Sequence, residues 1–221
     1  MKKILFSLLA MTACISTASL AAGPVPKYSW YGGLDLNASS APDSDVNGAN
    51  KAKIKYKGAF SLSDIKIGYR PESFYTETGN LRFEGELLGR SVDIKNVTSN
   101  GINTTPDSSL TVGAIMANMY YDIHTNSSFT PYIGAGAGIA DVSFRKNPGL
   151  GITDKDSKKT VAAGQLMVGV EYQPELLPST SWSLGYNLLL TDKPEFKATG
   201  KNAVLDEIVI SSIQLGFKYN F

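Results

Sequence analysis

Charged side chains recur at even intervals in the segment LRFEGELLGR, residues 81–90. Residues two positions apart lie on one face of a β-strand. On that face the segment would carry Arg82, Glu84, Glu86 and Arg90. Buried charges are costly unless they are paired. The spacing therefore indicates an interior ion-pair network, and the alternative interpretation is a gated path for ions.

Other segments with the same alternation carry charges on the same polar parity. If they close into one barrel with residues 81–90, their charged side chains share its interior. The complete predicted lumen charge network is Lys66, Arg70, Arg82, Glu84, Glu86, Arg90, Glu171 and Lys218.

His124 is the only histidine, and it stands in the segment DIHTNSSFT close to Asp122, Ser127 and Ser128. A histidine beside a hydroxyl could act as the base of a nucleophilic enzyme. The spacing here matches no catalytic motif, and the segment has the composition of a turn. We therefore interpret His124 as a solvated turn residue, and we expect no catalytic residue, no cofactor and no metal site.

Eight segments alternate apolar and polar residues with the two-residue period of a strand. They are residues 28–37, 63–70, 81–90, 111–123, 131–140, 164–172, 181–190 and 207–221. Each has about the 9–11 residues that a tilted strand needs to cross a membrane. The pattern predicts an all-β fold, an eight-stranded antiparallel up-and-down transmembrane β-barrel.

The connections between these segments alternate in length. Long polar connections are expected at 38–58, 91–110, 141–160 and 191–206, and shorter ones at 71–80, 124–130 and 173–180. Long loops at one end and short turns at the other are typical of outer-membrane barrels, whose long loops are extracellular.

A soluble barrel would turn its apolar face inward, whereas a membrane barrel turns it toward lipid. Aromatic residues at the strand ends of the apolar parity favour the membrane barrel, because such rings form a girdle at the head groups. The predicted girdle is Tyr28, Trp30, Tyr69, Tyr121, Tyr172 and Trp182. Gly134, Gly136 and Gly138 on the other parity would leave room for long charged side chains. An eight-stranded interior is so narrow that a plug of ion pairs is favoured over a pore.

The first 21 residues have the layout of a secretory signal peptide, with Lys2 and Lys3 before a short apolar run and Ser19-Leu20-Ala21 as the cleavage site. Residues 22–221 would then form the barrel domain. Cys14 is the only cysteine; it is interpreted as part of the removed signal, and the alternative is a lipid-attachment site. The mature chain would have no disulfide.

The mature chain is close to electrically neutral. Removing Lys2 and Lys3 from the 21 Lys and Arg residues leaves 19, against 20 Asp and Glu. This balance excludes the basic footprint of a nucleic-acid-binding protein.

The chain ends in LGFKYNF, with Ile213, Leu215, Phe217, Tyr219 and Phe221 on one parity. This ending, the segment WYGGLDLN and the pair ANMYYDI and FTPYIGAGAGIA resemble the eight-stranded outer-membrane barrels of the OmpA, opacity and surface-antigen types. The resemblance implies an outer-membrane location. It also implies that the five alternating residues from Ile213 to Phe221 are the signal for the barrel assembly machinery. Full-length OmpA carries a peptidoglycan-binding domain after its barrel, and we expect this protein to lack one because the sequence ends at Phe221.

The expected function is that of a non-enzymatic surface protein, a monomer that lies in the lipid bilayer and supports the membrane structurally. Its long loops would act in adhesion or as a surface antigen, with host-cell or matrix components as partners. The alternative is a narrow porin-like channel for ions or small solutes. A third hypothesis is a lipid-modifying enzyme that depends on His124.

Overall fold

The computed structural model describes residues 30–47, 52–99, 102–105, 108–144, 158–198, 201–205 and 207–221. The predicted signal peptide with Cys14, and Tyr28 of the predicted girdle, lie outside these residues. Within the described part of the chain, no helix is long and apolar enough to cross a membrane.

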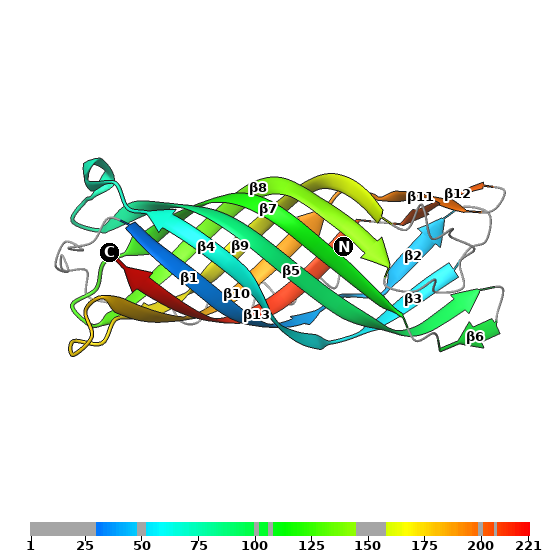
Figure 1. Cartoon of the computed structure of the whole chain (residues 1–221), viewed down its shortest axis with the longest axis horizontal. Helices are drawn as coiled ribbons and strands as arrows, with labels where there is room; N and C mark the ends of the chain where they lie inside the picture. Colours follow the sequence, from blue (N-terminus) through cyan, green and yellow to red (C-terminus); the bar gives the residue numbers. More distant parts are fainter. Residues whose placement is uncertain are drawn as a thin grey trace.

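Eight strands form a closed wall, and each one pairs antiparallel with the next (Figure 1). In order around the wall they are β1 (Trp30–Ser40), β4 (Ala59–Tyr69), β5 (Gly79–Ser99), β7 (Ser109–Ile123), β8 (Phe129–Phe144), β9 (Lys158–Tyr172), β10 (Thr180–Thr191) and β13 (Ile208–Asn220). The wall closes where β1 pairs with β13, from Tyr31 opposite Asn220 to Ser40 opposite Ser211. The predicted eight-stranded antiparallel up-and-down barrel is therefore confirmed.

The side chains of the wall alternate between outside and inside, as the two-residue period requires. On β7, Ile115 and Met119 are 59% and 49% exposed on the outer surface, whereas Met116 and Asn118 are buried inside. Large apolar side chains are exposed on all sides of the wall, among them Leu34, Ile65, Leu87, Ile133, Leu166, Leu184 and Leu215. Such an apolar exterior suits lipid rather than water.

The two ends of the barrel differ in length. At the tight-turn end, connections of five to nine residues join the strands, and the longest contains a 3-10 turn, η2 (Glu72–Phe74). At the other end, here named the extended end, five short strands continue the sheet (Figure 1). They are β2 (Ser44–Asn47), β3 (Ala52–Lys57), β6 (Ile102–Thr104), β11 (Glu195–Ala198) and β12 (Lys201–Leu205).

The predicted lengths of strands and loops were wrong at this extended end. The strands of the wall have 11 to 21 residues, and β5 alone has 21. Much of the predicted loops 38–58, 91–110 and 191–206 is strand, and in 91–110 this is because β5 continues to pair with β3 and β7 beyond Arg90. Most of the predicted loop 141–160 lies outside the described residues. The sheet order β11-β12-β2-β3-β5 shows that these strands form one hydrogen-bonded extension of the wall.

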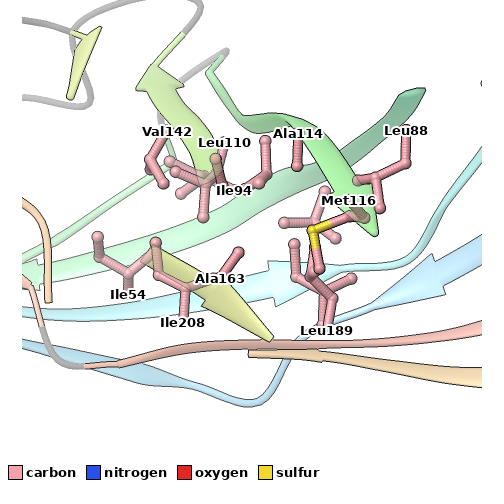
Figure 2. Packing of buried hydrophobic residues seen from close by; sticks show 14 of the residues in the cluster. Ile54, Leu88, Ile94, Leu110, Ala114, Met116, Val142, Ala163, Leu189 and Ile208 are labelled. Atoms are coloured by element: carbon pink, nitrogen blue, oxygen red, sulfur yellow. The ribbon is translucent and has the colours of Figure 1, made fainter. Parts of the chain in front are cut away.

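The interior has two layers of different chemistry. Toward the tight-turn end it holds the charged and amide side chains described below. Toward the extended end it is an apolar core, shown in Figure 2. The core consists of Ile54, Leu88, Val92, Ile94, Val97, Leu110, Val112, Ala114, Met116, Ala140, Val142, Ala163, Leu189, Ile208 and Ile210. Most inward-facing side chains of this layer are apolar, and the buried polar exceptions include Arg90, Thr191 and the hydrogen-bonded pair of Ser39 and Ser212.

Candidate functional site in the barrel interior

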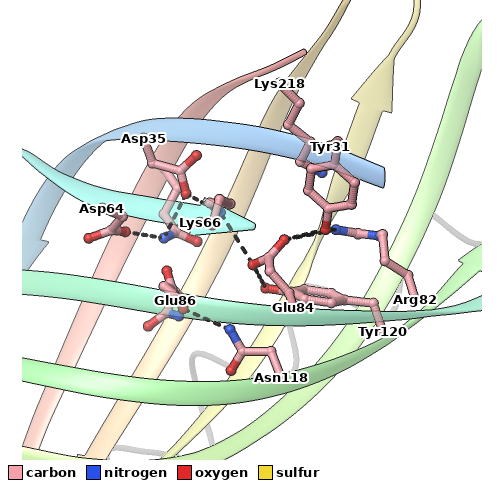
Figure 3. A network of polar contacts seen from close by, with 12 residues as sticks. Tyr31, Asp35, Asp64, Lys66, Arg82, Glu84, Glu86, Asn118, Tyr120 and Lys218 are labelled. Atoms are coloured by element: carbon pink, nitrogen blue, oxygen red, sulfur yellow. Dashed lines mark hydrogen bonds and ion pairs between the residues drawn. The ribbon is translucent and has the colours of Figure 1, made fainter. Parts of the chain in front are cut away.

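Arg82 on β5 is almost completely buried, and its guanidinium contacts side chains from three strands. Nε and Nη2 donate to the two carboxylate oxygens of Asp122 at 2.9 and 3.0 Å. Nη1 donates to the hydroxyl of Tyr31 at 2.8 Å and to Oε2 of Glu84 at 3.2 Å, as Figure 3 shows. A bidentate pair of this kind is strong and fixes the orientation of both groups.

Glu84 lies at the centre of the same network. Its Oε2 accepts from the Tyr31 hydroxyl at 2.5 Å, and its Oε1 accepts from the Tyr120 hydroxyl at 3.1 Å. The ammonium of Lys66 lies 3.7 Å from Oε1 of Glu84 and 2.5 Å from Oδ2 of Asp35. The carboxylate of Glu84 is thus paired with two cations and two phenols.

Two further groups of charges surround this centre. On one side, Arg90 forms an ion pair with Asp64. On the other, the ammonium of Lys218 lies 2.6 Å from one carboxylate oxygen of Glu171, and Nη2 of Arg70 donates to the other at 3.1 Å. All eight predicted network residues therefore lie inside the barrel, although Arg70 is only partly buried.

Glu86 differs from the other acids, because amides rather than cations contact it. Its Oε2 accepts from Asn118 Nδ2 at 2.8 Å and from Gln165 Nε2 at 2.6 Å. Gln165 in turn accepts from Asn187 Nδ2 at 2.6 Å. Among the described residues, no Lys or Arg nitrogen forms an ion pair with Glu86.

Three buried carboxylates, from Asp35, Asp64 and Glu86, offer ligand atoms within 4.8 Å of one another. This is the one group in the described residues whose donor set could hold a metal ion. Lys66 and Arg90 already supply positive charge to two of the three carboxylates. Two of the three carboxylates are thus paired with cationic side chains, and amides contact the third, Glu86.

Sequence reasoning missed several members of the network. Asp35, Asp64 and Asp122 complete the ion pairs, and the hydroxyl of Tyr31 with the amides of Asn118, Gln165 and Gln214 completes the hydrogen bonds. The signal for them was their parity: each shares its strand face with another inward-facing polar residue, two or four positions away in every case except Gln165, which stands six positions from Glu171.

Glycines make room for rings as well as for charges. A Cβ added to Gly68 would lie 1.9 Å from Cζ of Tyr31. One added to Gly134 would lie 2.4 Å from the ring of Tyr120. The prediction that Gly134, Gly136 and Gly138 leave room for charged side chains was wrong, because the side chains nearest to them are those of Tyr120, Asn118 and Met116. The guanidinium of Arg82 lies over the Tyr120 ring, 4.1 Å from its centroid.

His124 is not the solvated turn residue that the sequence predicted. It follows β7 directly, and only 6% of its surface is exposed. Its Nε2 lies 2.9 Å from Oδ1 of Asn80, and its ring lies 4.4 Å from the ring of Tyr75. Ser127 contacts Thr125 and the Phe129 backbone instead of His124. His124 is therefore buried at the tight-turn end of the barrel and is not exposed to solvent.

The described members of the predicted girdle gather at the tight-turn end. Trp30, Tyr69, Tyr172 and Trp182 are each 37–46% exposed, and Tyr121 is half-buried with its hydroxyl 2.8 Å from that of Thr78. Trp30 and Tyr69 lie side by side, with ring centroids 4.7 Å apart.

The predicted assembly-signal residues all lie on the outer surface of β13 and directly after it. Ile213, Leu215, Phe217, Tyr219 and Phe221 are 36–61% exposed. The backbone N–H of Phe221 donates to the carbonyl of Trp30 at 2.9 Å, which ties the last residue to β1.

Comparison with known proteins assigns the chain to a family of outer-membrane barrels. The family model of the outer membrane protein beta-barrel domain matches residues 7–221. The sequence is 28% identical to the outer membrane protein PagN of Salmonella typhimurium strain LT2 over 149 residues, which are 62% of this chain and 60% of PagN. The match thus spans less than two thirds of that relative.

Two solved structures show the same fold. The crystal structure of Neisserial surface protein A superposes with a TM-score of 0.51 and 17% identity, over 87% of this chain and 97% of that one. The solid-state NMR structure of the outer membrane protein AlkL in DMPC bilayers gives a TM-score of 0.55 and 16% identity, over 90% of this chain and 93% of that one.

Proposed function

We propose that this chain, which belongs to the outer membrane protein beta-barrel domain family, is a non-enzymatic surface protein whose barrel is closed to ions. The barrel holds the protein in the outer membrane, and the extended end carries the contact surface for a host-cell or matrix component. The chain acts as a monomer, and the extended end faces the outside of the cell, because long hairpins are extracellular in such barrels.

The observation that carries the proposal is that two layers fill the narrow interior, the ion-pair network and the apolar core, and each one would block the passage of an ion. An ion that crossed the charged layer would have to displace groups such as the bidentate pair of Arg82 and Asp122. Separating a buried pair is costly because each charge is left uncompensated. Beyond it lies the apolar core around Val92, Leu110 and Ile210, whose own side chains carry no group that could replace the ion's water.

The same core supports the idea of a rigid contact surface. Ile54 of β3 and Ile94 of β5 are buried in it, so the extension of the sheet is packed as well as hydrogen-bonded. The hairpin of β11 and β12 pairs with β2 at the far edge of this extension. Binding residues held on a rigid scaffold are the usual arrangement for recognition.

The geometry around His124 supports a non-enzymatic role. A nucleophilic enzyme needs a hydroxyl or thiol within hydrogen-bond reach of its base. The Nε2 atom of His124 is instead engaged by the amide of Asn80.

The test is adhesion of vesicles that display the protein to cultured epithelial cells and to purified matrix proteins. Replacing residues 195–205 with a short Gly-Ser linker removes the hairpin of β11 and β12 and should abolish binding. A matched control at the opposite end, Leu176→Gly with Leu177→Gly, should bind like the wild type. Equal binding by the hairpin variant and the wild type would contradict the proposed contact surface.

A further inference from the structure

The outer face of β3 carries a strip of lysines at the level where the apolar wall ends. Lys53, Lys55 and Lys57 are exposed, while Ile54 between them is fully buried and Tyr56 is half-buried against the apolar core. The lysines therefore point away from the barrel. Lys95 on the neighbouring β5 is also exposed, and Figure 1 shows β3 and β5 side by side. Lys55, Lys57 and Lys95 are named the lysine strip, and Lys53, which is paired with Asp43, lies beside it.

Register brings Lys95 into the strip. Lys55 lies opposite Asn96 and Tyr56 lies opposite Ile94, so an irregularity in the pairing places Lys95 beside the step between Lys55 and Tyr56. Three ammonium groups, those of Lys55, Lys57 and Lys95, thus project from two adjacent strands on the same outer surface.

Most of this positive charge is not neutralised by the protein. Lys53 lies 3.5 Å from Oδ2 of Asp43, and both side chains are about half exposed. Among the residues that the structure describes, Lys55, Lys57 and Lys95 form no ion pair within 4.0 Å, although Asp93 lies opposite Lys57 in the sheet. The strip can therefore accept an external anion.

The position of the strip along the barrel axis, relative to the apolar band, indicates which anion it meets. Tyr69 marks the tight-turn end of the apolar band on β4, and Phe60, 72% exposed, lies nine positions before it. At about 3.3 Å per residue and a tilt of about 40°, this distance is roughly 23 Å along the axis, close to the height of the apolar band of an outer-membrane barrel. Lys57 lies three positions beyond Phe60, or roughly 8 Å higher by the same rise, which is the depth of the head groups.

We propose that the lysine strip binds the phosphate groups of the glycolipid in the outer leaflet of the outer membrane. The strip faces sideways along the wall, like Phe60, and begins directly above the apolar band. A soluble polyanion would instead be met at the tip of the extended end. Lysine ammonium groups suit phosphate as compact charges with three donors each. The inference rests on the proposed orientation, in which the extended end is extracellular.

The test is binding of bisphosphorylated lipid A to the refolded protein in detergent, with dephosphorylated lipid A as the comparison ligand. The variant carrying Lys55→Gln, Lys57→Gln and Lys95→Gln should bind bisphosphorylated lipid A about a hundredfold more weakly, since each lysine contributes about fivefold near an anionic surface. The matched control Lys53→Gln, which removes a lysine already paired with Asp43, should change the affinity less than twofold. Faster migration of unboiled samples on a detergent gel verifies that each variant is folded.

Binding of a sulfated oligosaccharide is measured in the same way. Three results would overturn the inference: unchanged affinity of the triple variant for bisphosphorylated lipid A, equal affinity of the wild type for both lipids, or a triple variant that loses more affinity for the sulfated oligosaccharide than for lipid A. Orientation is tested separately by labelling a Lys53→Cys variant with a membrane-impermeant maleimide on intact cells. Absence of labelling would contradict both this inference and the proposed function. Labelling without lipid binding would contradict this inference alone.

Discussion

Arg82 and Asp122 form a bidentate ion pair between neighbouring strands, with Nε and Nη2 of the guanidinium 2.9 and 3.0 Å from the two carboxylate oxygens. The two side chains are 1% and 6% exposed. Because Arg82 also donates to Tyr31 and Glu84, this one pair connects β1, β5 and β7 across the interior.

Replacing Arg82 should destabilise the barrel strongly. Arg82→Met would leave Asp122 buried without its cation and Glu84 with one cation fewer, and breaking a buried pair in this way costs about 3–5 kcal/mol. Urea unfolding of the protein in lipid vesicles should show a loss of that size. Lys158→Met, which removes the exposed partner of Asp141, is the control and should leave the unfolding midpoint unchanged. A midpoint for Arg82→Met equal to that of the wild type would show that the pair is not needed.

Glu84 and Glu86 lie two positions apart on β5 but should respond differently to neutralisation. Glu84→Gln removes a charge that Lys66, Arg82 and two phenols stabilise, and a loss of about 2–4 kcal/mol is expected. Glu86 has only amide donors, so Glu86→Gln should change the unfolding free energy by less than about 1 kcal/mol. Equal losses in the two variants would contradict the assignment of Glu84 as the centre of the network.

Gly68 should tolerate no side chain while Tyr31 occupies the lumen. The added Cβ of Gly68→Ala would lie 1.9 Å from Cζ of Tyr31, so folding should fail or cost about 2–3 kcal/mol. Gly113→Ala is the control, because nothing lies within 4 Å of its added Cβ. In a Tyr31→Ala background the extra cost of Gly68→Ala should disappear, as a double-mutant cycle would measure. An unchanged extra cost in that background would point to a backbone effect instead.

The apolar layer should behave like the core of a soluble protein. Leu189→Ala, at a position with no exposed surface, should lower the unfolding free energy by about 2–5 kcal/mol. Leu184→Ala on the same strand is the comparison, because its side chain is 56% exposed on the outer surface, where lipid can fill the space. A larger loss at Leu184 than at Leu189 would contradict the view that the extended end has a packed interior.

Local alternation explains why much of the fold could be predicted. The parity of residues 81–90 was enough to assign Arg82 and Glu84 to the interior, because side-chain direction in a strand depends only on the residue's position. The partners could not be predicted in the same way. Asp122 and Tyr31 reach Arg82 through the registers of four strands, β1, β4, β5 and β7, which no local pattern contains.

The extended end was missed for a related reason. Val92 and Ile94 alternate with Ser91 and Asp93, so a strand signal was present in the predicted loop. Its polar residues suggested solvent, and the expected inward face was polar. Beyond Arg90 the inward-facing residues of β5 are apolar, as Val92 and Ile94 show. The inward-facing positions that carry charges in the first half of β5 therefore carry apolar side chains in the second half.

The burial of His124 could not be predicted from its own segment. Asn80 and Tyr75, which contact its ring, lie more than forty positions earlier in the chain. They come near only because Gly79 pairs with Ile123 at the start of β5.

The most direct test of the closed interior is the conductance of the refolded protein in a planar lipid bilayer, measured beside Glu84→Gln. A gel mobility shift first establishes that both samples are folded. Because the apolar layer remains when the charge at Glu84 is removed, the account predicts that neither protein gives reproducible conductance steps. Steps from the wild type whose size changes in Glu84→Gln would show that ions pass through the charged layer, and the closed-barrel account would be wrong.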